Sequence, residues 1–177
     1  VDTGPDRQIC RDASVMIGDT ASGAFPPLRY FWSPAIGLSD ISSPTPVASP
    51  VSSTEYVLKV TDARGCAAYD TVLVTVNEVD IEAGDNLSIC PGESVELQGS
   101  VRSGKNPFVW QWTPSTGLSD TTIRNPIATP AASTWYTLRV VDGNGCVDRD
   151  SVLVTVWPVI QVAISVQGST VLCEGDS

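Results

Sequence analysis

Four oxygen-bearing side chains surround one cysteine in residues 142–156, which read DGNGCVDRDSVLVTV. They are Asp142, Asn144, Asp148 and Asp150. Carboxylate and amide oxygens are ligands that Ca²⁺ prefers, about six to eight of them per ion. Further acids stand earlier in the chain: Glu78, Asp80, Glu82 and Asp85. The stretch therefore predicts either a calcium loop, to which these acids would contribute, or a turn between two strands.

The chain contains no histidine. That absence excludes Ser-His-Asp and Cys-His nucleophiles, histidine general bases and the commonest zinc ligands. The acidic residues are scattered along the sequence, and no two of them form a recognisable general acid and base. We therefore expect no enzymatic activity and no cofactor other than the calcium considered above.

The net charge of the 177 residues is −10, from 20 acidic and 10 basic side chains. This charge would repel a nucleic acid and an anionic membrane surface alike. The sequence also lacks a run of about 18 apolar residues that could cross a bilayer, and it shows no N-terminal export signal. We expect no nucleic-acid partner and no membrane insertion, with any export signal outside these residues.

The composition predicts that strands and turns position these side chains. Met occurs once while Gly and Pro total 27 (14 + 13), which favours strands and turns over helices. Clusters of Gly, Pro, Asn and Asp separate short alternating or aromatic segments, a pattern typical of a β-sandwich. The clearest segments are SVELQG (94–99), FVWQW (108–112), TWYTLRVV (134–141) and SVLVTV (151–156).

The sequence aligns with itself, without a gap, after a shift of 80 residues, as Cys10 and Cys90 show. A fixed period of this length indicates tandem domains. The matching segments are CRDASVMI (10–17) with CPGESVEL (90–97), YFWSPAIGLSD (30–40) with WQWTPSTGLSD (110–120), TPVASPVSSTEYVLKVTDARGC (45–66) with NPIATPAASTWYTLRVVDGNGC (125–146), and DTVLVTV (70–76) with DSVLVTV (150–156). A third unit then begins, because LCEGDS (172–177) resembles ICPGES (89–94).

We therefore predict an all-β fold of tandem immunoglobulin-like β-sandwich modules in a rod-like array. Module 1 spans residues 1–77, module 2 spans 78–157, and 158–177 form the first strand of a truncated third module. A complete unit of about 80 residues suits a seven-strand immunoglobulin-like sandwich. The linker around Asn77 is only a few residues long, so neighbouring modules should abut.

The repeat weakens the calcium interpretation. Module 1 reads DARGCAAYDTVLVTV (62–76) at the equivalent place and keeps only Asp62 and Asp70 of the four oxygen-bearing side chains. The EF-hand pattern also fails, because Cys146 occupies the third ligand position and Leu153 that of the closing glutamate. We interpret the stretch mainly as the F–G hairpin and the last strand, and keep calcium as an alternative for module 2 and its junction.

The five cysteines fall at equivalent positions of the repeat. Cys10 and Cys66 recur as Cys90 and Cys146, and Cys173 matches the first of each pair. Such regular usage in a chain without histidine predicts disulfides and an oxidising exterior. We expect pairing within a module, Cys10–Cys66 and Cys90–Cys146, with the partner of Cys173 outside these residues.

Pairing between neighbouring modules, such as Cys10 with Cys146, stays open as the alternative. In an immunoglobulin-like sandwich the turn before strand B and the F–G hairpin lie at opposite ends. That separation exceeds the Cα–Cα distance of about 4.4–6.8 Å that a disulfide requires.

Three segments carry a family resemblance: AGDNLSICPGESVELQGS (83–100), WTPSTGLSDTTIRNPIATP (112–130) and STWYTLRVVDGNGCVDRDSVLVTV (133–156). They resemble the PKD-like and immunoglobulin-like repeats of large bacterial surface adhesins exported by the type IX secretion system, including SprB-like gliding-motility adhesins. The resemblance covers essentially the whole chain, twice, and implies PKD-like sandwiches in an array at the cell surface. The chain departs from eukaryotic-type PKD modules, because WxPxxGLSD stands where those have WDFGDG.

The resemblance also implies O-glycosylation. In this bacterial group the acceptor is a Ser or Thr that follows Asp and precedes an apolar residue or Thr. The matching hydroxyl residues are Thr20, Thr71, Thr121 and Ser151.

Several aromatic residues and turns are interpreted as architecture. Trp32 and Trp112, like Tyr56 and Tyr136, are equivalent in the repeat, so we expect them in the core and at a corner of each module. GLSD (37–40 and 117–120) is expected to form a turn. Trp135 differs, because it replaces Glu55, and it is the aromatic residue we single out for ligand or interface contact.

We therefore expect an extracellular, cell-surface protein: a structural stalk segment of a long secreted adhesin that holds a distal binding region away from the cell, in gliding or surface attachment. Its partners would be neighbouring repeats of the same chain, with cell-surface polysaccharide or the secretion and motility machinery as further candidates. Two alternatives stay open. One is an accessory carbohydrate-binding module of a secreted polysaccharide-degrading enzyme, and the other is a subunit of a surface filament.

Overall fold

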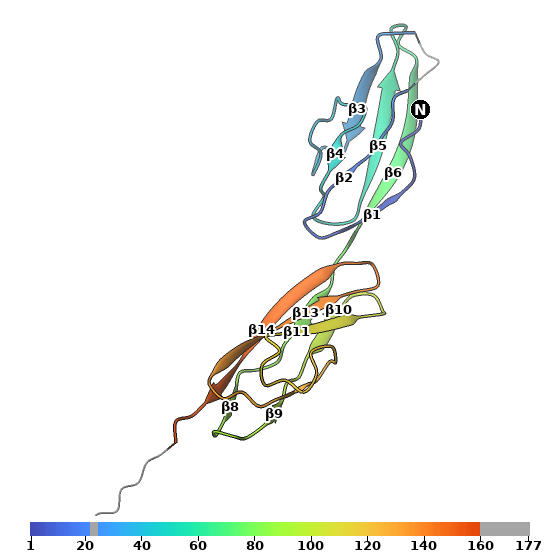
Figure 1. Ribbon diagram of the computed structural model, residues 1–177. Helices are drawn as coiled ribbons and strands as arrows, with labels where there is room; N and C mark the ends of the chain where they lie inside the picture. Colours follow the sequence, from blue (N-terminus) through green and yellow to red (C-terminus); the bar gives the residue numbers. More distant parts are fainter. Residues whose placement is uncertain (22–24, 160–177) are drawn as a thin grey trace, which may run out of the picture.

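The structure is a computed structural model that describes residues 1–21 and 25–159. Every regular element in that part of the chain is a β-strand, and it contains no helix long and apolar enough to cross a membrane. Two sandwiches with separate cores lie end to end (Figure 1). The predicted all-β tandem fold is confirmed. The third module predicted for 158–177, with Cys173, lies outside the described residues from 160 onward.

Module 1 is built around a four-stranded sheet in the order β1-β6-β5-β3. A two-stranded sheet of β2 and β4 packs against it across the core. β5 and β6 form the long F–G hairpin, while β1 pairs with β6 in parallel. The strands are β1 (Arg7–Cys10), β2 (Val15–Met16), β3 (Arg29–Ser33), β4 (Val47–Ala48), β5 (Thr54–Thr61) and β6 (Ala67–Asn77).

Module 2 repeats this plan. Its main sheet has the order β11-β13-β14-β8, β12 pairs with β9, and β10 pairs with β7. The strands are β7 (Asp80–Glu82), β8 (Leu87–Ile89), β9 (Val95–Glu96), β10 (Ser100–Ser103), β11 (Val109–Thr113), β12 (Ile127–Ala128), β13 (Thr134–Val141) and β14 (Val147–Val156). We retain residues 77 and 78 as the proposed boundary between the modules, since β6 ends at Asn77 and β7 begins at Asp80.

Alternation along the strands builds each core. β5 and β13 show the same burial pattern, in which every second side chain is buried. Tyr136, Leu138 and Val140 on β13 point into the sandwich and meet Val152 and Val154 of β14. A strand places successive side chains on opposite faces, so the period-two pattern in the sequence decides which face is buried.

Two aromatic residues per module carry a polar atom into the core and satisfy it there. Trp112 and Tyr136 are fully buried. The indole N–H of Trp112 donates to the carbonyl of Ile123 at 3.2 Å, and the Tyr136 hydroxyl donates to the carbonyl of Thr116 at 2.9 Å. The matching bonds in module 1 link Trp32 to Ser43 and Tyr56 to Ile36. The predicted core and corner roles are confirmed.

The GLSD turn also forms as expected. Gly117 has a φ of +75°, a conformation that glycine adopts without strain. The Ser119 hydroxyl accepts from the amide of Ile127 at 3.0 Å, and the Asp120 carboxylate accepts from the amide and hydroxyl of Thr122, both at 2.7 Å. These bonds lower the pKa of Asp120. Residues 37–40 of module 1 repeat the geometry.

Replacing Tyr136 by Phe should destabilise module 2 by about 1–2 kcal/mol, because the Thr116 carbonyl loses its partner inside the protein. Four of the five tryptophans lie in module 2 (Trp110, Trp112, Trp135 and Trp157), so urea unfolding followed by tryptophan fluorescence reports this module. Tyr69→Phe is the control, since Tyr69 is exposed. Equal unfolding midpoints for the two variants would contradict the role of the hydroxyl.

The disulfide-locked junction as candidate functional site

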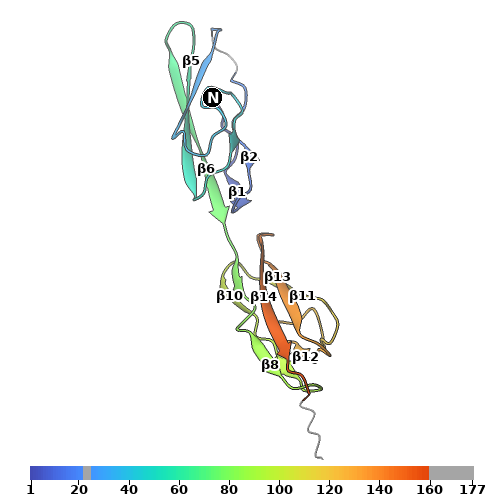
Figure 2. The same cartoon turned by 90° about the vertical axis from the view of Figure 1, so that its left-hand side faces the viewer.

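The junction between the modules is short. Only Glu78 and Val79 separate the end of β6 from the start of β7. The F–G hairpin of module 2, between β13 and β14, turns at this same level and faces the end of β1 (Figures 1 and 2). Segments far apart in the sequence therefore meet here.

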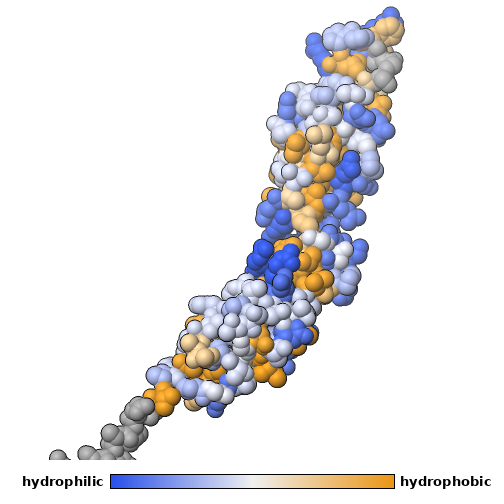
Figure 3. Space-filling view, viewed as in Figure 1, coloured by the Kyte–Doolittle hydropathy of each residue, from blue (hydrophilic) through white to orange (hydrophobic). Residues whose placement is uncertain are grey.

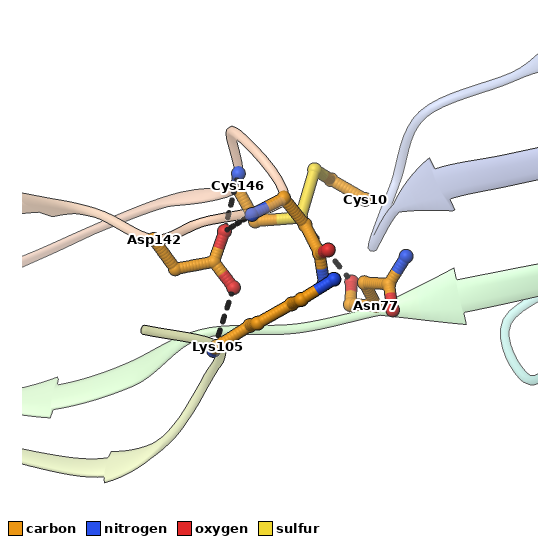
Figure 4. The surroundings of a disulfide bond; sticks show 6 residues. Cys10, Asn77, Lys105, Asp142 and Cys146 are labelled. Atoms are coloured by element: carbon orange, nitrogen blue, oxygen red, sulfur yellow. Dashed lines mark hydrogen bonds between the residues drawn. A yellow bond between two sulfur atoms is a disulfide. The ribbon is translucent and has the colours of Figure 1, made fainter. Parts of the chain in front are cut away.

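A disulfide joins Cys10 of module 1 to Cys146 of module 2 (Figure 4). Their Cα atoms are 5.4 Å apart, inside the usual range for a disulfide, and their separation in sequence is 136. Cys66 and Cys90 are free and exposed. The expected pairing within a module, Cys10–Cys66 and Cys90–Cys146, is therefore wrong, and the alternative between modules is the one that forms.

The register of β1 on β6 gives the physical reason. Because the two strands are parallel, Cys10 lies opposite Asn77, at the last residue of β6. Cys66 directly precedes the first residue of that 11-residue strand. At about 3.3 Å per residue, the two cysteines of one module lie roughly 35 Å apart. No disulfide can span that distance.

Asp142 shapes the hairpin that presents Cys146. Its Oδ1 accepts from the amides of Asn144 and Cys146, both at 2.9 Å, and its Oδ2 accepts from the amide of Lys105 at 3.1 Å. Figure 4 shows the carboxylate between the hairpin and Lys105. Gly145 follows with a φ of +82°. The carboxylate thus fixes the backbone from Asn144 to Cys146 and links the hairpin to Lys105.

The electrostatics of Asp142 favour its charged form. The residue is buried, and burial by itself raises the pKa of the carboxyl. The backbone amides of Lys105, Cys146 and Asn144, with the positive charge of Lys105, act in the opposite direction and hold the pKa below its ordinary value. Asp142 is therefore ionised at neutral pH and accepts all three bonds.

Module 1 contributes a turn and an ion pair to the junction. The amide of Ala13 donates to the carbonyl of Cys10 at 3.0 Å, and the amide of Arg11 donates to Asn77 at 2.8 Å. The Arg11 side chain meets Glu78 at 2.5 Å. Because both side chains are largely exposed, this pair contributes little to stability. The Cys146 sulfur lies 3.8 Å from the Asn77 carbonyl oxygen, a packing contact since a disulfide sulfur carries no hydrogen.

The predicted calcium ligands have other partners. Asp148 accepts from the amide of Ile81 at 3.1 Å, and Asp150 accepts from the amide of Ala83 at 2.7 Å. Both carboxylates therefore hold the first strand of module 2 against β14. Asp70 holds the first residues of module 1 through Thr3 in the same way, at 2.7 Å. Asp70 and Asp150 are equivalent in the repeat, and this was the sequence signal for a carboxylate that holds the first residues of each module. That role was not predicted from the sequence.

Asn144 is placed in the hairpin turn by the bond from its own amide to Asp142. In residues 1–21 and 25–159, no group of three or more His, Cys, Asp or Glu side chains is arranged to hold a metal ion. This arrangement gives the calcium interpretation no support, and calcium binding in module 2 stays a prediction.

The remaining site residues lie on the surface. Thr20, Thr71 and Ser151 are exposed and Thr121 is half-buried, so O-glycosylation at these four stays a prediction. Trp135 is 57% exposed on β13, opposite Leu153. It is not a core residue, as expected, and its role in ligand or interface contact also stays a prediction.

Comparisons with known proteins return structural similarity without sequence similarity. No family model matches the chain, and no curated protein matches it. The I9–I11 tandem from titin is 16% identical with a TM-score of 0.45, over 89% of this chain and 65% of the titin chain. The insect immune protein hemolin is 12% identical with a TM-score of 0.46, over 88% of this chain and 46% of the hemolin chain. The PKD domain from the KIAA 1837 protein is 21% identical with a TM-score of 0.37, over 44% of this chain and 84% of that domain's chain. The strand order and the two cores of this chain establish its fold.

Replacing Asp142 by Asn should destabilise module 2 by about 1–3 kcal/mol near pH 6, because the new amide group would point a donor at the Lys105 amide. The pKa of Asp142 is lowered in the folded protein. Its stabilising effect is therefore present above the ordinary carboxyl pKa and is lost as the pH falls through the lowered value. The difference in the free energy of unfolding between wild type and variant should therefore decrease as the pH falls.

Urea unfolding at a series of pH values between about 6 and 2.5 measures this difference. The matched control is Asp62→Asn in module 1, since Asp62 accepts only through Oδ1, which asparagine retains. A difference between wild type and Asp142→Asn that does not change with pH would refute the assignment.

Proposed function

We propose that this chain is a structural stalk segment of a long extracellular adhesin at the bacterial cell surface. In this proposal its sandwiches form a stiff rod that holds a distal binding region away from the cell. The observation that carries the proposal is the disulfide between the modules. The resemblance of residues 83–156 to the repeats of type IX secreted, SprB-like adhesins supports the same function.

The disulfide makes the junction resistant to bending. Two covalent connections join the modules, the backbone through Glu78 and Val79 and the bridge from Cys10 to Cys146. A single short linker leaves a hinge, whereas two separate attachments restrain rotation about either one. The elongated outline in Figures 1 and 3 is the shape that such a rod requires.

The disulfide also changes the path of a stretching force. A pull on the two ends of the chain passes from Cys10 directly to Cys146, so the residues between them form a closed loop that carries no tension. The two cores consist almost wholly of residues in that loop, including Trp32, Tyr56, Trp112 and Tyr136. The array would therefore resist extension under load.

The surface and the redox chemistry suit an exterior location. Disulfides persist in oxidising compartments and are rare in the cytosol. The net charge of −10 favours solubility and disfavours contact with anionic polymers. Together these properties support a secreted segment whose contacts are mainly with other modules.

Stretching single molecules by their two ends tests the load path. With the disulfide intact, only the residues outside the loop should extend. Reduction should free a segment of sequence separation 136, which adds about 450–490 Å at roughly 3.3–3.6 Å per residue. The Cys66→Ser/Cys90→Ser variant should behave as wild type, whereas Cys10→Ser should extend fully without a reductant. The same extension for oxidised wild type and Cys10→Ser would contradict the proposal.

A further inference from the structure

The two free cysteines occupy opposite ends of the described structure. Cys66 lies at the turn between β5 and β6, and Cys90 lies just after β8, next to the end of β14. Both are exposed. Each is the repeat equivalent of a half of the formed disulfide, since Cys66 matches Cys146 and Cys90 matches Cys10.

The hairpin around Cys66 has the geometry of the hairpin that presents Cys146. Asp62 accepts from the amides of Arg64 and Cys66, both at 2.9 Å, as Asp142 does from Asn144 and Cys146. The amide of Ala63 donates to Phe25 at 2.9 Å, as that of Gly143 donates to Lys105. Cys66 is therefore already held in the conformation in which its equivalent forms a disulfide.

The turn at Cys90 likewise repeats the turn at Cys10. The amide of Glu93 donates to the carbonyl of Cys90 at 3.1 Å, as the amide of Ala13 donates to Cys10. β8 pairs in parallel with β14 in the register of β1 on β6, which places Cys90 beside Trp157 as Cys10 is placed beside Asn77. The turn at Cys90 and the end of β14 thus have the geometry that receives the Cys146 hairpin in the formed junction.

A groove lies beside Cys90 at the position that the junction occupies in module 1. It is lined by Cys90, Pro91, Trp157, Pro158 and Val159. Their equivalents in module 1 are Cys10, Arg11, Asn77, Glu78 and Val79, which line one side of the junction, while Cys146, Val147 and Asp148 line the other. The surface around Cys90 therefore corresponds to the module 1 side of the formed junction. Figure 3 shows hydrophobic surface at this end of module 2.

The surfaces around Cys90 and Cys66 are both apolar. Around Cys90 the groove is apolar, with Trp157 57% and Val159 66% exposed. The hairpin at the other end presents Ala67, Ala68 and Tyr69 next to Cys66, all exposed. The formed junction instead uses polar residues on both sides, including Glu78 and Asp148. Apolar surface would meet apolar surface in a junction of Cys90 with Cys66.

We propose that Cys90 of one copy of this chain forms a disulfide with Cys66 of a second copy, equivalent to the bond between Cys10 and Cys146. The two copies would then be joined head to tail. The contact would bury the Cys90 groove under the Cys66 hairpin of the next copy and extend the rod at both ends. This inference rests on the proposed structural function and names the surfaces through which the array grows. A head-to-tail contact of this kind forms open filaments rather than closed dimers.

The bond forms by thiol–disulfide exchange with a low-molecular-weight disulfide such as oxidised glutathione. The thiolate of one cysteine attacks that disulfide and releases one glutathione thiolate. The thiolate of the second cysteine then displaces the other glutathione from the mixed disulfide. The two protein thiols lose two protons and two electrons, and one glutathione disulfide becomes two glutathione thiols.

Oxidation of the 177-residue chain in a glutathione buffer tests the proposal, with Cys173→Ser in every sample so that the third thiol takes no part. Non-reducing electrophoresis should show a ladder of linked copies, and digestion after glutamate residues should yield a peptide that joins Cys66 to Cys90. Cys66→Ser and Cys90→Ser should each remain monomeric alone. Their equimolar mixture should stop at a dimer, because each copy offers one half.

Trp157→Ser tests the groove separately, because it leaves both thiols in place and should slow linkage several-fold. Linked copies of Cys66→Ser alone or of Cys90→Ser alone, or glutathione adducts without a ladder, would overturn the proposal. Stretching of the monomeric Cys66→Ser/Cys90→Ser variant reports on the Cys10–Cys146 load path by itself. Failure of the linkage is thus distinguishable from failure of the proposed function.

Discussion

The parallel pairing of β1 with β6, repeated by β8 with β14, is the constraint on which the rest of the structure depends. It brings the first cysteine of each module to the end where the last strand leaves, far from the F–G hairpin of the same module. The hairpin of the following module lies at that end instead. A bond between modules is then the only one of these pairings that the geometry allows, and Cys10–Cys146 forms it.

Hydrogen bonds to acidic side chains keep this arrangement in place. Asp150 and Asp70 hold the first residues of each module against the last strand. Asp142 and Asp62 shape the hairpins that carry Cys146 and Cys66. The side chains that suggested a metal site thus serve the junction and the module edges, and the same chemistry recurs at both hairpins. Stiffness, load path and growth surface all follow from the position of these hairpins.

The sequence correctly predicted the strands that depend on local alternation of apolar and polar residues. The strand expected at 134–141 matches β13 to the residue, because its alternation is complete. The strand expected at 94–99 shortens to Val95–Glu96, because its partner β12 offers only two residues to pair with. The sequence left two disulfide pairings open, because the repeat makes Cys66 and Cys146 equivalent and only strand register decides which of them Cys10 meets. The partners of Asp148 and Asp150 are backbone amides of β7 and of the residue after it, and an amide partner cannot be identified from residue type; the repetition of Asp70 as Asp150 was the available signal.

Mapping of the disulfides in the native chain tests the central claim most directly. Trypsin cuts after Arg7, Arg11, Arg139 and Arg149, which isolates Cys10 in QICR (8–11) and Cys146 in VVDGNGCVDR (140–149). Without reductant, mass spectrometry should find these two peptides joined to each other, and reduction should separate them. Linkage of either peptide to residues 65–102, which contain Cys66 and Cys90, would contradict the account.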